Sequence, residues 1–122
     1  MDDNEKKRQV EDVVHLVEVV EEKKFPGSVT IIPGVTSWAH HDDGRTEISE
    51  AAIQGGIGEL SRTAAHELGH HEQHQDPAWD RNLGRYRVDP DAKRAVEVDA
   101  ERRAAQTKTL IKKALTGGKI II

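Results

Sequence analysis

Two histidines four residues apart, with a glutamate between them, are the residues of this chain best suited to chemistry. They lie in the segment His66-Glu67-Leu68-Gly69-His70. On an α-helix, side chains at positions i and i+4 share a face, so both imidazoles can point at one metal ion. Glu67 then lies beside the ion without ligating it, where a carboxylate can take a proton from metal-bound water. The spacing therefore predicts a metal site with a general base, and it requires a third protein ligand from elsewhere in the chain.

Glu97 is the strongest candidate for the third ligand. It falls inside a second expected helix, with Ala100, Glu101 and Ala104 on the same face. Small alanine side chains on that face would let this helix approach the histidine helix closely. We expect Glu97 to complete the ligand set and Glu101 to accept the second ring proton of a ligand histidine. Asp99, two residues from Glu97, points off that face and is a weaker candidate.

Asp76 is an alternative third ligand, ten residues after His66. Families that take a ligand at this spacing need a glycine between the two residues to turn the chain back. This chain has Gln73 at that place, and its one methionine, Met1, cannot form the methionine turn that those families place beneath the metal. Asp76 therefore stays the lesser alternative.

The other histidines have simpler interpretations. His74 forms a further i, i+4 pair with His70, but we interpret His71 and His74 as a solvated helix end, where partly charged histidine suits the helix dipole. The cluster His40-His41-Asp42-Asp43 is interpreted as a polar turn between strands, although it is a fourth ligand candidate if it folds over the site.

The elements that must position these residues predict an α+β domain. Valines recur at helical spacing across residues 4–24, which predicts a helix, with a strand as the alternative because several of these residues are β-branched. Extended segments at 29–32, 35–39 and 45–49 suit a small three-stranded antiparallel sheet. Trp38 would belong to its core or line a cleft. An extended substrate would add a strand to the edge of the sheet, formed by residues 35–39 or 45–49.

Two long helices follow the sheet in this prediction. The first is the histidine helix, over residues 57–76, limited by Pro77. Its expected buried stripe is Ile57, Leu60, Ala64, Ala65 and Leu68. Residues 78–88 are interpreted as a loop. The second helix, over residues 89–116, begins with Asp89 as its cap and Pro90 in its first position. Residues 1–27, the sheet at 28–49, both helices and a tail at 117–122 make up one domain, 1–122.

Composition excludes several classes of protein. The 122 residues carry a net charge of -4 with both signs interspersed, so there is no basic surface for nucleic acid. With no cysteine, metal ligands must come from His, Asp and Glu. No apolar run reaches the length of a membrane span, and the polar N-terminus is unlike a signal peptide. We expect a cytoplasmic protein, with export by a route that leaves no N-terminal mark as the alternative.

The two motifs together resemble the gluzincin metallopeptidases. The resemblance rests on His66-Glu67-Leu68-Gly69-His70 followed by Glu97-Val98-Asp99-Ala100-Glu101, and it covers about 60 residues. By size and plan the chain is most similar to the minigluzincins, with the ImmA/IrrE-like peptidases a near second. The resemblance implies a small zincin-like fold, a Zn²⁺ ion held by His66, His70 and Glu97, and an acidic residue at 101 that supports a ligand histidine. The family usually has aspartate there, and this chain has glutamate.

This resemblance predicts a zinc metalloendopeptidase that acts on a peptide or protein substrate. Glu67 would take a proton from metal-bound water and pass it to the leaving amine. Tyr86 is a candidate for stabilising the oxyanion, and His40 or His41 is an alternative. Without catalysis, the site would instead stabilise an interaction or regulatory domain, but a structural metal site has no use for the base Glu67.

The C-terminal residues Ile120, Ile121 and Ile122 form an apolar tail. We expect this tail to close the core or to pair as a strand, because an exposed apolar tail favours aggregation. Its resemblance to minigluzincins suggests an alternative, in which the tail occupies the cleft and keeps the enzyme latent as a zymogen. Pairing of strands or tails would also allow a homo-oligomer.

Overall fold

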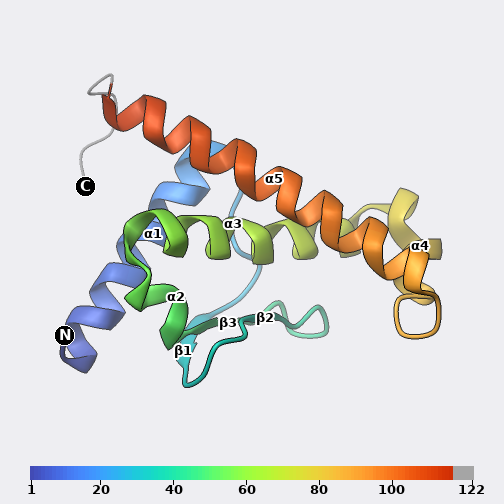
Figure 1. Cartoon of the computed structure of the whole chain (residues 1–122), viewed down its shortest axis with the longest axis horizontal. Helices are drawn as coiled ribbons and strands as arrows, with labels where there is room; N and C mark the ends of the chain where they lie inside the picture. Colours follow the sequence, from blue (N-terminus) through green and yellow to red (C-terminus); the bar gives the residue numbers. More distant parts are fainter. Residues whose placement is uncertain (117–122) are drawn as a thin grey trace.

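The computed structural model describes residues 1–116, in which five α-helices and three short strands form an α+β architecture (Figure 1). The helices are α1 (Asp3–Glu21), α2 (Glu50–Gln54), α3 (Gly56–Gln75), α4 (Asp80–Gly84) and α5 (Pro90–Thr116), with a 3-10 turn, η1 (Pro77–Trp79). The strands are β1 (Val29–Ile32), β2 (Trp38–Ala39) and β3 (Thr46–Ser49). The roles predicted for the tail at 117–122 concern residues outside those described.

Helix α1 forms where valine periodicity predicts a helix, and the alternative of a strand is wrong. The Asp2 side chain caps the helix by accepting a hydrogen bond from Glu5 N over 2.8 Å. Its apolar face is buried, through Val10, Val13, Leu16 and Val17. A local cap and a 3.6-residue apolar period therefore prevail over the β preference of the branched side chains.

The sheet differs from the predicted antiparallel arrangement. Its strand order is β1-β3-β2, with β3 in the centre. Strand β1 pairs with β3 in parallel, Val29 opposite Thr46 and Ile32 opposite Ser49, whereas β2 pairs with β3 in the antiparallel direction. After β1 the chain crosses to the far edge to form β2 and returns through the middle. The expectation that residues 45–49 could be an edge strand is therefore wrong, and β2 is the edge beside α3.

Three further differences concern the helices. The short helix α2 was not predicted; Ser49 caps it, and Gly56, at φ +88°, lets the chain turn from α2 into α3. Residues 78–88, predicted as a loop, contain α4 and part of η1. Ile57 is 44% exposed, so the buried stripe of α3 begins at Leu60 rather than at Ile57. The cap of α5 is as predicted, with Asp89 accepting from Asp91 N over 2.9 Å.

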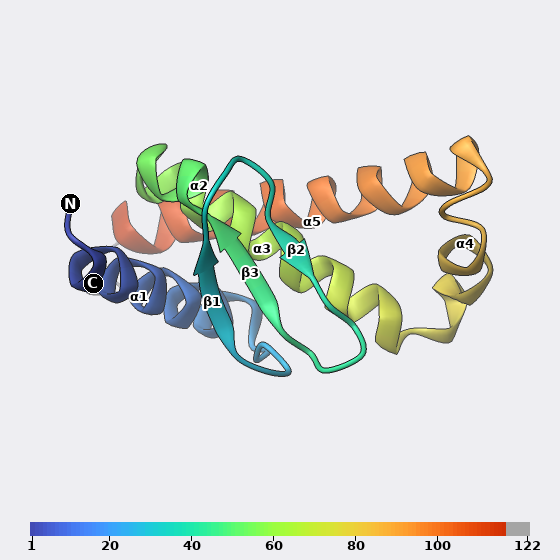
Figure 2. The same ribbon diagram turned by 90° about the horizontal axis from the view of Figure 1, so that it is seen from below.

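Helix α3 lies between the sheet on one side and α5 on the other (Figures 1 and 2). The two long helices approach closely because small residues face each other. Ala100 and Ala104 are fully buried, and a methyl group added at Gly69 would lie 3.6 Å from the Ala100 Cα. This close approach brings the middle of α5 next to the histidine-bearing face of α3. No helix within residues 1–116 has the length and apolar character needed to cross a membrane.

Candidate metal centre

His66 and His70 on α3 and Glu97 on α5 form a group whose ligand atoms can hold one metal ion. The Nε2 atoms of the two histidines are 3.0 Å apart. His66 Nε2 lies 3.3 Å from Glu97 Oε2, and His70 Nε2 lies 3.6 Å from Glu97 Oε1. All three ligand atoms lie within 4.8 Å of one another. Two ligand atoms bound about 2.1 Å from one tetrahedral ion would be ~3.4 Å apart, so these separations fit a metal of that size.

The two imidazoles present their edges to a common point. Their ring centroids are 4.7 Å apart and their planes meet at 82°. This arrangement follows from the i, i+4 spacing on one face of α3. Glu97 reaches them from α5 because the alanine face lets that helix come close. Within the described residues 1–116, no other set of three His, Asp or Glu side chains brings its ligand atoms together in this way.

Glu67 lies beside this group but does not belong to it. Its residue is only 5% exposed, and that burial raises the pKa of its carboxyl group, opposed by the positive charge that His70 and His66 can carry. The Glu67 carboxylate makes no hydrogen bond to another of residues 1–116. It lines the same cleft as the three ligands. A carboxyl group on a largely buried residue that lines the cleft, next to a metal position, suits the transfer of a proton.

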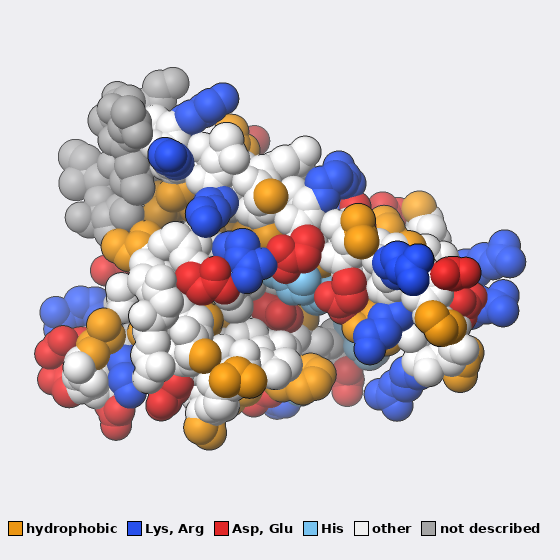
Figure 3. All heavy atoms as spheres, in the orientation of Figure 1, with side chains coloured by type: hydrophobic (Ala, Val, Ile, Leu, Met, Phe, Trp, Pro, Cys, Tyr) orange, Lys and Arg blue, Asp and Glu red, His pale blue; other side chains and the backbone are white. Residues whose placement is uncertain are grey.

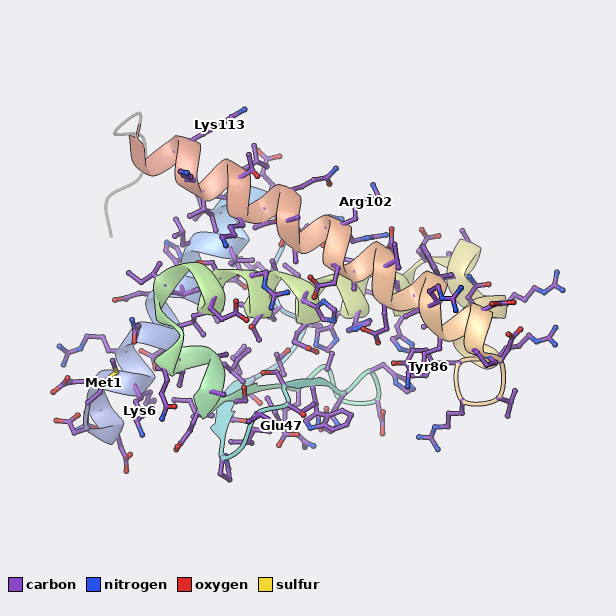
Figure 4. The ribbon with its side chains drawn as sticks, viewed as in Figure 1. Met1, Lys6, Glu47, Tyr86, Arg102 and Lys113 are labelled. Atoms are coloured by element: carbon purple, nitrogen blue, oxygen red, sulfur yellow. The ribbon has the colours of Figure 1, made fainter. Side chains whose placement is uncertain are left out.

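Tyr86 is brought to the centre by the chain between α4 and α5. Its hydroxyl donates a hydrogen bond to Glu97 Oε1 over 2.5 Å. Burial and this bond raise the pKa of Tyr86 to about 12, so the hydroxyl stays protonated and available as a donor. Figure 4 shows Tyr86 beneath the start of α5, on the side that faces the sheet. A residue whose position could not be judged from the sequence thus touches a predicted metal ligand.

Glu101 lies where a supporting carboxylate was expected. Its Oε1 is 2.7 Å from His66 Nδ1, although the ring N–H is not well aligned with it. Its second oxygen, Oε2, accepts a hydrogen bond from Arg62 over 2.7 Å. Arg62 also binds Glu59, so this arginine holds Glu101 in place from the neighbouring helix. No sequence pattern indicated this role of Arg62.

Gln73 is the supporting residue that sequence reasoning missed. Its side chain is fully buried, and its Oε1 lies 2.9 Å from His70 Nδ1. Its amide nitrogen donates to Val96 O and to Asp99 Oδ2, each over 2.9 Å. Because both amide hydrogens are used in this way, Oε1 must accept, and the proton of neutral His70 resides on Nδ1. The lone pair on Nε2 is then free to face the metal position.

Asp99 anchors this arrangement from α5 and is not a ligand. Arg102 and Arg103 both donate to its carboxylate, over 2.6 and 2.7 Å. Although burial raises the pKa of Asp99, the hydrogen bonds from Gln73 and Arg102 outweigh it, and the pKa lies below its usual range. The sequence offered only the helical positions of these two residues: Gln73 lies three residues after His70, and Asp99 lies two residues after Glu97. It did not show that the two side chains bond to each other.

The alternative ligands lie elsewhere. Asp76 ends α3 and caps η1, accepting from Ala78 N over 3.0 Å. His74 is exposed and stacks on His41, with ring centroids 4.2 Å apart. His40 is held by Glu47, and residues 41–43 form the expected turn. The interpretation of His71 as solvated is wrong: it is 2% exposed and joins Thr46 Oγ1 over 2.8 Å, because β3 packs over that side of α3.

A cleft of about 970 Å³ surrounds the metal centre. The edge strand β2 and the chain before it form one wall, α3 carries the histidines, and α5 with the segment before it forms the other wall. Trp38 is 54% exposed and lines this cleft rather than the core. Figure 3 shows histidine side chains reaching the surface between α5 and the sheet, with acidic side chains on both sides. The centre is therefore accessible to a molecule larger than water.

Comparisons with protein-family models, with curated proteins and with solved structures find no match to this chain.

Proposed function

We propose that this protein is a zinc metallopeptidase of the gluzincin type, with a zincin-like fold. The observation that carries the proposal is the position of Glu67. Glu67 is a largely buried residue that lines an open cleft beside three convergent ligand atoms. A metal that only stabilises a fold needs ligands but no adjacent base. The presence of the base favours hydrolysis over a structural role.

The donor set supports zinc as the metal. Two imidazole nitrogens and one carboxylate are a common catalytic zinc set, and they leave a fourth position for water or substrate. Each histidine has a carboxylate or amide oxygen next to its outer ring nitrogen, Glu101 for His66 and Gln73 for His70. Such partners orient the rings and raise their basicity toward the metal. The two histidine ligands are thus oriented by neighbouring residues that do not bind the metal themselves.

In peptide hydrolysis, residues of this chain would have separate roles. A zinc ion held by His66, His70 and Glu97 would polarise the scissile carbonyl and make a water more acidic. Glu67 would accept a proton from that water and deliver it to the leaving amine, a task suited to a carboxyl group whose pKa burial has raised. Tyr86 holds its proton and can turn its hydroxyl from Glu97 toward the developing oxyanion. The peptide chain would lie along β2, the edge strand that lines the cleft.

Metal content and cleavage together test this proposal. The native chain, Glu67→Gln and Glu97→Gln would be loaded with Zn²⁺, freed of excess metal and assayed for bound zinc and for cleavage of casein or a peptide library. We expect one zinc per native chain with peptide cleavage, and zinc without cleavage in Glu67→Gln. Glu97→Gln should lose most of both. Stable zinc binding without any cleavage by the native chain would favour the non-catalytic, metal-stabilised domain instead.

A further inference from the structure

The end of the cleft next to α4 carries two cations that have no carboxylate partner among residues 1–116. Arg87 belongs to the segment between α4 and α5, and Lys93 to the first turn of α5. Both line the cleft together with Tyr86 and Glu97. Neither forms an ion pair with any of residues 1–116. We call Arg87 and Lys93 the basic rim. In Figure 3, lysine and arginine side chains gather at this end of the molecule.

The basic rim is close to the metal centre. Lys93 Nζ lies 5.7 Å from the centroid of the Tyr86 ring, and the hydroxyl of that ring contacts Glu97. Lys93 and Glu97 are also four residues apart on α5, so they are one helical turn apart on the same face. An extended peptide advances ~3.3 Å per residue. A group about two residues from the scissile bond would therefore reach the rim.

Acidic side chains around the cleft do not neutralise the rim. Glu59 and Glu101 share Arg62 on the far side of the histidines. Asp89, two residues from Arg87, lies 3.7 Å from Arg85 and caps α5. Asp91, two residues from Lys93, lies 4.0 Å from Arg94. Glu97 is held by Tyr86 and by the two histidines, and Glu67 is buried. The positive charge at this end of the cleft is therefore available to bind an anionic group of a ligand.

We infer that the basic rim binds a carboxylate of the peptide substrate, about two residues from the bond that is cleaved. An arginine can bind a carboxylate through two parallel hydrogen bonds, and the lysine adds a point charge. The carboxylate belongs either to an aspartate or glutamate side chain or to the C-terminus of the peptide. This inference rests on the proposed peptidase function, because it assigns the substrate of the same site.

Matched peptides separate the two sources of the carboxylate. One series would place glutamate or glutamine at each of three positions on either side of one scissile bond, with both ends blocked. A second series would shorten the peptide to a free or amidated C-terminus at the same distances. For the native zinc-loaded chain we expect kcat/KM about tenfold higher for the carboxylate member of one matched pair, falling at high salt. The series that shows the difference identifies the source.

The variants Arg87→Gln, Lys93→Gln and the double change test the rim itself. The double variant should lose the preference, so that its kcat/KM is the same for the carboxylate peptide and for its neutral partner. Arg94→Gln is the matched control, because Arg94 is an exposed arginine in the same part of α5 that faces Asp91 and does not line the cleft. Its preference should be unchanged. Equal rates for all matched pairs with the native chain, or a preference that survives in the double variant, would overturn the inference.

Binding separates this inference from the proposed catalysis. The zinc-loaded Glu67→Gln chain would be titrated with the same fluorescently labelled peptides, alone and combined with the rim variants. Tighter binding of the carboxylate peptides that disappears in the rim variants supports the inference even if the native chain cleaves nothing, in which case the proposed peptidase function fails. Cleavage with no carboxylate preference in rates or binding rejects the basic rim and leaves the peptidase proposal intact.

Discussion

Gln73 Oε1 accepts a hydrogen bond from His70 Nδ1 over 2.9 Å, and the same side chain is fastened by two bonds to α5. The orientation of a predicted metal ligand on one helix is thereby set by the backbone and a carboxylate of the other. Gln73 stands where the alternative layout, with Asp76 as third ligand, would need a glycine. In the structure this glutamine instead orients the second histidine, His70.

Replacing Gln73 should weaken metal binding more than it weakens the fold. Gln73→Met keeps the length of the side chain but removes the acceptor for His70, so we expect zinc affinity to fall ~10–100-fold. Competition with a chromophoric chelator measures this affinity. Gln75→Met, an exposed position two residues later, is the control and should bind zinc as the native chain does. Unchanged affinity in a folded Gln73→Met protein would contradict the supporting role.

Removing the Tyr86 hydroxyl should affect turnover more than metal binding. Tyr86→Phe loses the donor that we assign to the oxyanion, and loss of one such donor costs about 10²-fold in kcat. The hydrogen bond to Glu97 is lost as well, but the ligand set stays complete. Steady-state kinetics and zinc titration would separate the two effects. A fall in zinc occupancy that accounts for all lost activity would mean that Tyr86 acts only by positioning Glu97.

The contact between α3 and α5 leaves room for one methyl group at Gly69. An added Cβ would lie 3.4 Å from Arg103 Cδ and 3.6 Å from the Ala100 Cα, which are ordinary contacts. Because glycine inside a helix costs ~0.5–1 kcal/mol relative to alanine, Gly69→Ala should raise the free energy of unfolding by about that amount. Gly69→Val should lower it, since its extra methyl groups would push against Ala100. Urea denaturation of the three proteins measures the order, and a less stable Gly69→Ala would contradict the packing described.

The raised pKa of Glu21, on α1, predicts that the stability of the fold depends on pH. Burial, together with the nearby Glu72, raises its pKa from 4.5 to about 7, and its Oε2 is buried without a hydrogen-bond partner. Between pH 4.5 and 7 the unfolded chain releases this proton while the folded chain retains it. The unfolded state therefore binds fewer protons, and this carboxyl group makes the fold less stable as pH rises. Below pH 4.5 the cost is absent, and above pH 7 it is fully present.

Glu21→Gln should remove that cost. The half-buried side chain is partly screened by solvent, so we expect a gain on the order of 1–2 kcal/mol in the free energy of unfolding at pH 8 and almost none at pH 4. Thermal and urea unfolding at both pH values measure it. Glu11→Gln, at an exposed position of the same helix, is the control and should change little at either pH. An equal gain at pH 4 and pH 8 would show that the effect is not the titration of Glu21.

Local signals in the sequence were enough to predict the long helices and the two histidines that share one face of α3. The apolar period of α1, the cap and proline at Asp89-Pro90, and the i, i+4 spacing of His66 and His70 each act within a few residues. Helix formation depends on such neighbours, so these features follow from the chain alone. The pairing of Glu97 with the histidines was also predicted, because small residues on one helical face indicate a close helix contact.

Tertiary structure decided which residues surround that site. The parallel pairing of β1 with β3, the contact of His71 with Thr46, and the contacts of Tyr86 with Glu97 and of Gln73 with Asp99 join residues 11 to 26 positions apart. Patterns of polarity show that such side chains can form hydrogen bonds, but they do not identify the partner residue. The partner depends on how strands and helices pack, and packing is a property of the whole chain. The sequence by itself thus determined two histidines, a base and a carboxylate, and indicated the helix contact that joins them, whereas packing decided which residues support and enclose that centre.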